Sequence, residues 1–310
     1  MKKLFTLAFV LTLAVSAFGQ KQKSKDDLYK EIGTLTNTKK QDDMAKAYPM
    51  AKEYLERFGK DDKDGKDEKV KYISMFVTRY REHQFNVALD AHKYAEGFAL
   101  GREILAAQPD NVDVNMNLAY SGYDAMSLKG DKTYLDESLG YAKKTVQMME
   151  AGTMPARFAP FTDKDEASAF MYFVVGNLML DKDKKEAAHN LYKATAFESK
   201  IKNNSATYYL IATCYEDQYT KFAAEMKSKA DKKMSDAEYD AAAARGSSIV
   251  DGMMDAYARA VKRAETDKNA DAVQWKLRLA QIYKFTRKTE DGLPEYINQV
   301  VTTPMRDPGK

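Results

Sequence analysis

A spaced pattern of large and small residues occurs twice in succession in this chain. In each copy, a large residue is followed at fixed gaps by a second large residue, a small one and a third large one. The copies are Tyr172, Val175, Gly176 and Met179, and, 36 residues later, Tyr208, Ile211, Ala212 and Tyr215. These gaps place the residues on one helix face, where the small residue lets another helix approach closely. Since one such unit cannot bury its apolar face alone, the pattern predicts units that stack on one another.

The composition indicates a mostly helical chain of balanced charge. Pro is scarce at 7 residues and Gly is modest at 15, and 49 Lys and Arg residues nearly balance 46 Asp and Glu. This neutrality argues against nucleic acid or an anionic membrane as the main partner. Cys214 is the single cysteine, which excludes an intrachain disulfide. Its place beside the apolar stripe of a predicted helix favours a buried, unreactive thiol.

The N-terminus has the composition of an export signal. Lys2 and Lys3 precede an uncharged apolar run that ends at Ala17, and Gly19 completes a small-x-small cleavage motif. We therefore expect a cleaved signal peptide over residues 1–19 and a periplasmic or secreted protein. No cysteine follows the cleavage site, so we expect no lipid anchor. No later segment is apolar enough to suggest a membrane span.

Nearly every later stretch indicates helix, and we expect one helical repeat domain at 28–305 after a flexible leader at 20–27. The clearest units are expected at 112–149, 169–200, 205–264 with an insertion, and 273–304. Within the insertion, Ser235 and Glu238 match a capping box that begins an Ala-rich helix, and Gly246 is expected to end that helix. The polar tail at 306–310 is expected to fray.

These positions resemble the tetratricopeptide repeat (TPR), a helix–turn–helix unit of about 34 residues. The family pattern has an aromatic residue, Leu, a small residue and Tyr on its first helix. Ala188 and Tyr192 match the second-helix pattern of a small residue and an aromatic. The match departs at Asn115, which holds the aromatic position of its unit, and at Trp275, which stands one residue early. The resemblance implies an all-α fold, a TPR-like right-handed α-solenoid; an unrelated helical bundle is the alternative.

The resemblance also implies a concave groove, lined by the first helix of each unit, that holds an extended peptide or a partner helix. The residue after the aromatic position would face this groove, as would residues four and seven positions further on. The candidate groove residues are Met116, Tyr120, Tyr123, Phe173, Asn177, Tyr209, Thr213, Leu277 and Gln281. The alternative interpretation is that the residues after the aromatic positions pack against a neighbouring helix.

The sequence contains no motif that indicates catalysis, a metal or a cofactor. His83, His92 and His189 are the only histidines, and none has a second His or Cys at metal-binding spacing. Neither a Gly-rich phosphate loop nor a nucleophile elbow is present. We therefore expect no enzyme and no cofactor, but an exported scaffold that binds a protein or peptide. A helical carrier of carbohydrate or another small ligand is the alternative, since 20 Tyr and 14 Phe could supply stacking rings.

Overall fold

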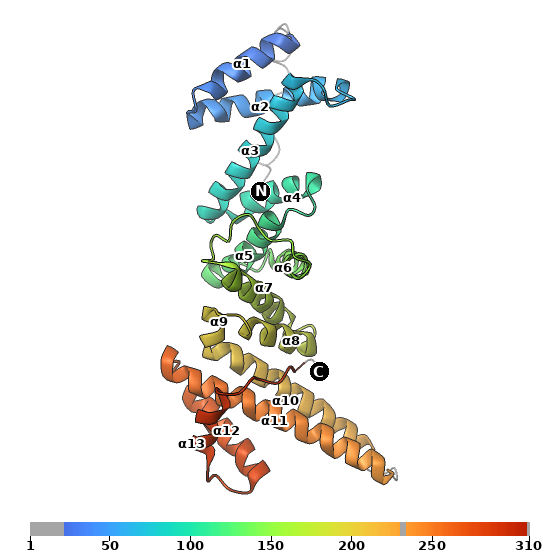
Figure 1. Cartoon of the computed structure of the whole chain (residues 1–310), viewed down its shortest axis with the longest axis vertical. Helices are drawn as coiled ribbons and strands as arrows, with labels where there is room; N and C mark the ends of the chain where they lie inside the picture. Colours follow the sequence, from blue (N-terminus) through green and yellow to red (C-terminus); the bar gives the residue numbers. More distant parts are fainter. Residues whose placement is uncertain (1–21, 230–233, 309–310) are drawn as a thin grey trace, which may run out of the picture. The chain divides into compact units, whose positions relative to one another are not determined.

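The computed structural model describes residues 22–229 and 234–308, which are helical over most of their length (Figure 1). The described residues form 13 α-helices and one short 3-10 turn, and no strand occurs among them. The all-α fold predicted from the sequence is therefore confirmed. The predicted signal peptide at 1–19 lies outside the described residues, so it stays a prediction.

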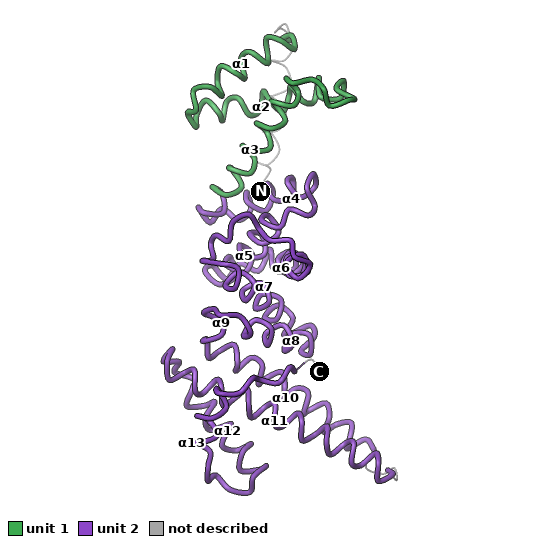
Figure 2. The backbone as a smooth tube through the Cα atoms, viewed as in Figure 1, with its two compact units in different colours: residues 1–87 green, residues 88–310 purple. Residues whose placement is uncertain are grey.

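The chain divides into two compact units, residues 1–87 and residues 88–310 (Figure 2). The first unit holds α1 (Lys25–Asn37), α2 (Gln41–Phe58), the 3-10 turn η1 (Gly59–Asp61) and most of α3 (Glu68–Asp90). The second unit begins near the end of α3. It holds α4 (Tyr94–Ala107), α5 (Val112–Lys129), α6 (Leu135–Glu150), α7 (Lys164–Met179), α8 (Lys184–Thr195), α9 (Lys200–Asn203), α10 (Ser205–Ser228), α11 (Asp236–Asp267), α12 (Ala272–Arg287) and α13 (Leu293–Val300). The repeat-unit boundaries expected from the sequence remain predictions.

The first unit is built around apolar residues at helical spacing on α1, α2 and α3. Its core consists of Leu28, Ile32, Ala47, Ala51, Tyr54, Val70, Ile73 and Val77. Two ion pairs join α1 to the start of α3: Lys25 Nζ lies 2.7 Å from Asp67, and Lys69 Nζ lies 2.7 Å from Asp26. Such pairs add little stability where they are exposed. The buried apolar face is therefore what holds the three helices together.

In the second unit, successive helices pack as TPR-like pairs. The helices α5 and α6, α7 and α8, and α10 and α11 form these pairs, and α6 packs on α7 as α8 packs on α10. The last two helices, α12 and α13, both pack on α11. Packing in sequential pairs is the arrangement expected from the repeated pattern, because each pair buries its apolar face against the next.

The small residue of the repeated pattern lies where two helices meet at close range. A Cβ atom added at Gly176 would lie 2.9 Å from the backbone N of Leu191 and 3.0 Å from the backbone O of Ala187. Both atoms belong to α8, so the backbones of α7 and α8 touch at this position. Ala212, at the matching position of α10, is completely buried. The packing role predicted for Gly176 is confirmed.

Of the two expectations about α11, one is wrong and one is confirmed. Gly246 does not end a helix, because α11 continues through it from Asp236 to Asp267. Instead, Gly246 makes room for an aromatic ring: an added Cβ would lie 2.8 Å from Cε1 of Phe222 on α10. The capping box of Ser235 and Glu238 at the start of α11 is confirmed.

The expected fraying of the C-terminal tail is also wrong as far as Pro308. Met305 and Pro308 are buried, and the Asp307 carboxylate lies 2.9 Å from Nδ1 of His189 on α8. The tail therefore contacts a helix of an earlier pair. The polar sequence of the tail alone does not predict this contact.

Candidate partner-binding face

The candidate groove residues lie on the first helices of the pairs, α5, α7, α10 and α12, but they differ in exposure. Met116 is completely buried at 0% exposure, so it packs in the core and offers no surface to a partner. Leu277 is 55% exposed and Gln281 is also exposed. The half-buried members are Tyr120, Tyr123, Phe173, Asn177, Tyr209 and Thr213.

Five half-buried rings form one continuous cluster at the face shared by α5 and α7, which we call the aromatic cluster. Its members are Tyr120, Tyr123, Phe161, Phe170 and Phe173. Neighbouring ring centroids are 5.2 to 6.2 Å apart, within the range of favourable edge-to-face and tilted contacts. Burial raises the pKa of the Tyr120 and Tyr123 hydroxyls, so both rings are neutral near pH 7. The cluster is a packed apolar surface with polar edges.

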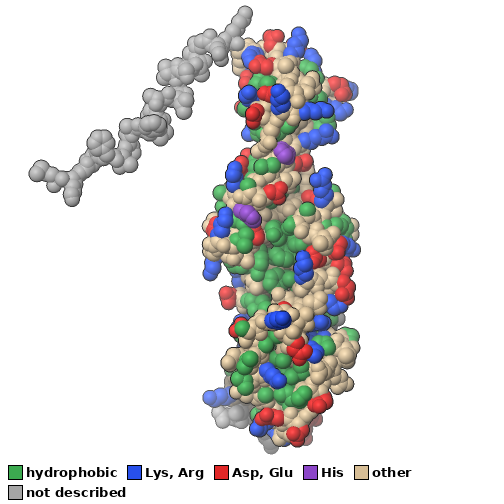
Figure 3. All heavy atoms as spheres, turned by 90° about the vertical axis from the view of Figure 1, so that its left-hand side faces the viewer, with side chains coloured by type: hydrophobic (Ala, Val, Ile, Leu, Met, Phe, Trp, Pro, Cys, Tyr) green, Lys and Arg blue, Asp and Glu red, His purple; other side chains and the backbone are tan. Residues whose placement is uncertain are grey.

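Two members of the aromatic cluster were not among the candidates from the sequence. Phe170 stands one turn before Phe173 on α7, and this spacing could have identified it. Phe161 comes from the segment between α6 and α7, and only the path of that segment brings its ring to 5.2 Å from Phe170. Figure 3 shows hydrophobic side chains gathered on one face of the molecule.

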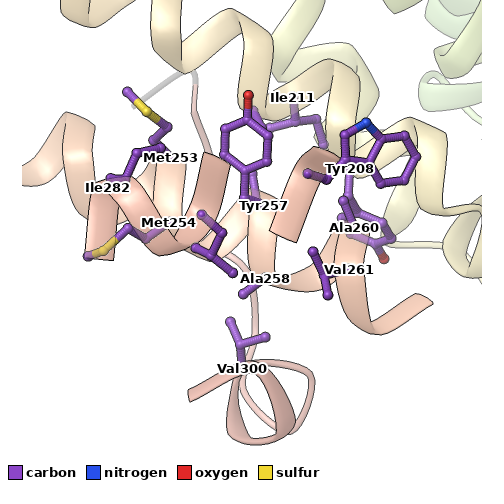
Figure 4. Close-up of a cluster of buried hydrophobic side chains, with 14 of the residues drawn as sticks. Tyr208, Ile211, Met253, Met254, Tyr257, Ala258, Ala260, Val261, Ile282 and Val300 are labelled. Atoms are coloured by element: carbon purple, nitrogen blue, oxygen red, sulfur yellow. The ribbon is translucent and has the colours of Figure 1, made fainter. Parts of the chain in front are cut away.

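A second group of rings lies where α10, α11 and α12 meet. Tyr209 stacks on Trp275 with centroids 4.8 Å apart and an interplanar angle of 14°. Trp275 is buried and Lys276 is exposed, so the register of α12 follows the tryptophan although it stands one residue early. The side chains of Val300, Ile282 and Tyr257 belong to the core of these last helices (Figure 4).

Beside Tyr209 and Trp275 lies an open recess of about 420 Å³ with hydrogen-bonding groups on its wall. The Glu216 carboxylate accepts hydrogen bonds from Nε of Arg278 at 2.6 Å and from the hydroxyl of Tyr257 at 3.1 Å. Burial, and then the Glu216 charge, raise the pKa of Tyr257. The recess thus combines stacking surface with a paired carboxylate and guanidinium.

The described residues contain no group of three His, Cys, Asp or Glu side chains that could hold a metal ion. His92 lies 3.2 Å from Asp124 and 2.9 Å from the Tyr94 hydroxyl, which makes it part of a structural hydrogen-bond network. None of the described helices combines the length and apolarity needed to cross a membrane.

Cys214 should be unreactive in the folded protein. Its side chain is completely buried, and burial raises the pKa of the thiol to about 12. Because the thiolate is the reactive form, we expect Ellman's reagent at pH 8 to label no thiol in the native protein and one thiol in denaturant. Rapid labelling under native conditions would show that Cys214 is exposed to solvent.

No family model matches this chain, and no curated protein matches it. The chain is similar to the solved structure entitled "Crystal structure of MamA protein", with 17% identity and a TM-score of 0.35, over 69% of this chain and 95% of that one. It is also similar to the structure entitled "Human IFIT1 dimer with m7Gppp-AAAA", with 13% identity and a TM-score of 0.33, over 91% of this chain and 51% of that one. Both scores are below 0.5, so the fold assignment depends on the helix packing of this chain.

Proposed function

We propose that the chain is an interaction scaffold that binds a peptide or helix of a partner protein on the face formed by α5, α7, α10 and α12. The observation that supports this most directly is the aromatic cluster of Tyr120, Tyr123, Phe161, Phe170 and Phe173. Aromatic side chains are enriched at protein interfaces, and Tyr is among the residue types that contribute most to binding energy there.

The chemistry of this face suits an extended segment or an amphipathic helix. Mutual ring contacts hold the five side chains in place, so these side chains lose little rotamer entropy when a partner binds. Asn177 stands one turn after Phe173 on α7 and is half-buried, so its amide can hydrogen-bond to the main chain of a bound segment. The recess beside Tyr209 extends the same chemistry to α10 and α12.

The partner can be captured by photo-crosslinking. A photoreactive phenylalanine analogue at Phe173 or Tyr209 should crosslink one specific protein in the native compartment. Tyr239 is the matched control, because it is 67% exposed on α11 and lies outside the proposed face. Equal crosslinking from Tyr239 would contradict a specific binding face.

With the captured partner purified, the double substitution Phe173→Ala and Tyr209→Ala should weaken binding by about 10-fold or more. Tyr239→Ala should leave the dissociation constant unchanged. Isothermal titration calorimetry measures both, and circular dichroism checks that each variant is folded. An unchanged dissociation constant in the folded double variant would show that the partner does not bind on this face.

The recess beside Tyr209 is the observation that favours the second function, a carrier of carbohydrate or another small ligand. Trp275, the only tryptophan, stacks on Tyr209 and therefore reports on this recess. Under the scaffold proposal, titration with simple sugars leaves its fluorescence unchanged. A saturable change with one sugar would favour the carrier.

We also propose that the scaffold acts outside the cytoplasm, as the composition of residues 1–19 supports. N-terminal sequencing of the protein from its native host should find Gln20 as the first residue. A mature protein that retains Met1 or Lys2 would contradict export by a cleaved signal.

A further inference from the structure

Residues 303–308, which we call the strap, leave the end of α13 and cross other helices without forming a helix themselves (Figure 1). The strap contacts α11 and α8, which are second helices of their pairs. The proposed partner face uses residues such as Phe173 and Tyr209, which differ from the Arg259 and His189 that contact the strap.

The main chain of the strap is recognised by a buried ion pair on α11. Arg259 donates from Nε to Asp255 at 2.8 Å, and its Nη2 donates to the carbonyl of Thr303 at 2.6 Å. Burial raises the pKa of the Asp255 carboxyl, while the backbone and the charge of Arg306 in the strap lower it. The side chains of Arg259 and Asp255 are only 7% and 16% exposed. A hydrogen bond to a main-chain carbonyl lets a protein recognise an extended peptide independently of its side chains.

The side chains of the strap supply the specific contacts. Met305 is buried in the core of the last helices, and Pro308 is buried further along. Between them, Asp307 lies 2.9 Å from Nδ1 of His189. The strap thus presents the apolar Met305 and, two positions later, the acidic Asp307 followed by Pro308.

The surface that holds the strap continues into a cavity of about 860 Å³. Its wall includes Asp307 and Pro308 of the strap, Tyr192 of α8, and Tyr215 of α10. The same wall carries Lys185, Lys221 and Arg245 but also Asp183 and Asp217, and Lys221 pairs with Asp217 at 2.8 Å. The cavity therefore offers room for a segment longer than the strap, beside charges of both signs.

We propose that the surface made by His189, Tyr192, Tyr215, Asp255 and Arg259, which we call the strap groove, is a second peptide-binding site occupied by the chain's own strap. Its external ligand is an extended segment of a partner protein with an apolar residue followed two positions later by Asp-Pro. That segment binds by displacing the strap. Since the strap is covalently attached, it competes at an effective concentration in the millimolar range.

The test uses the full chain with a nitroxide label on the strap. Arg306→Cys places the label on an exposed side chain of the strap. The buried thiol of Cys214 does not compete for the label. The probe is a synthetic peptide of residues 303–308, and electron paramagnetic resonance measures label mobility. We expect the peptide to convert an immobile spectrum saturably into a mobile one. A peptide with Lys in place of Asp should not do so.

A second full-length variant, Asp307→Lys, releases the strap by placing a positive charge opposite His189. Fluorescence anisotropy should show it binding the labelled peptide about 10-fold more tightly than the unmodified chain does. Adding His189→Ala should weaken that binding. If the strap label stays immobile at saturating peptide, and folded Asp307→Lys binds the native and Lys-containing peptides equally, the strap is a structural element and the proposal is wrong.

Discussion

Replacing Gly176 with alanine should lower the free energy of unfolding by about 2–3 kcal/mol. The added Cβ would lie 2.7 Å from Cγ of Leu191, 2.9 Å from the backbone N of Leu191 and 3.0 Å from the backbone O of Ala187. A flexible side chain could move away, but two of these atoms belong to the backbone of α8. The clash therefore separates α7 from α8, and the close packing around completely buried Leu191 is lost.

Gly140→Ala is the matched control. Gly140 is an exposed residue inside α6, and an added Cβ would meet nothing within 4 Å. Alanine should stabilise this helix by about 0.5–1 kcal/mol, because glycine loses more backbone entropy on folding. Urea denaturation followed by circular dichroism gives both values. Equal urea midpoints for Gly176→Ala and the unmodified chain would mean that the stability of the fold does not depend on the close approach of α7 and α8 at Gly176.

Replacing Arg259 with alanine should cost about 3–5 kcal/mol at pH 7, because it leaves Asp255 buried without its partner. Burial already raises the pKa of Asp255, and the Arg259 charge counteracts that effect. The variant also loses the hydrogen bond to the carbonyl of Thr303. Lys262→Ala on the same helix is the control. It breaks only a pair with Glu265 three residues away, which is worth little.

The loss in Arg259→Ala should depend on pH in a defined direction. A carboxyl with a raised pKa in the folded state binds its proton more tightly there than in the unfolded state, so acidification stabilises the fold relative to neutral pH. The cost of Arg259→Ala should therefore be smaller at pH 5 than at pH 7. Asp255→Asn added to Arg259→Ala should recover part of the loss. No recovery in the double variant would show that the buried charge is not the cause.

The sequence predicted the features that depend on neighbours along the chain. The capping box of Ser235 and Glu238 involves residues three positions apart, and the packing role of Gly176 follows from a pattern that repeats within one helix. Asn115 in an aromatic position is explained by a local contact, since its amide donates to the carbonyl of Asn111 at 2.8 Å.

Expectations based on one residue type were less successful. The sequence predicts a helix end at Gly246, but this glycine makes room for Phe222 on another helix, and no local rule reveals that contact. The repeat position of Met116 predicts a groove residue, yet the packing around α5 buries its side chain completely. Phe161 joins the aromatic cluster only because the segment before α7 returns to α5.

The amino-acid pattern by itself determined that the described chain is helical and that its helices pack in successive pairs, because helix periodicity and capping act over a few residues. Only the tertiary structure decided which aromatic side chains share one face and that Asp307 meets His189, 118 residues earlier. The physical reason is that a contact between distant residues depends on the angles and spacing at every helix pair between them, and these are set by packing and not by local sequence.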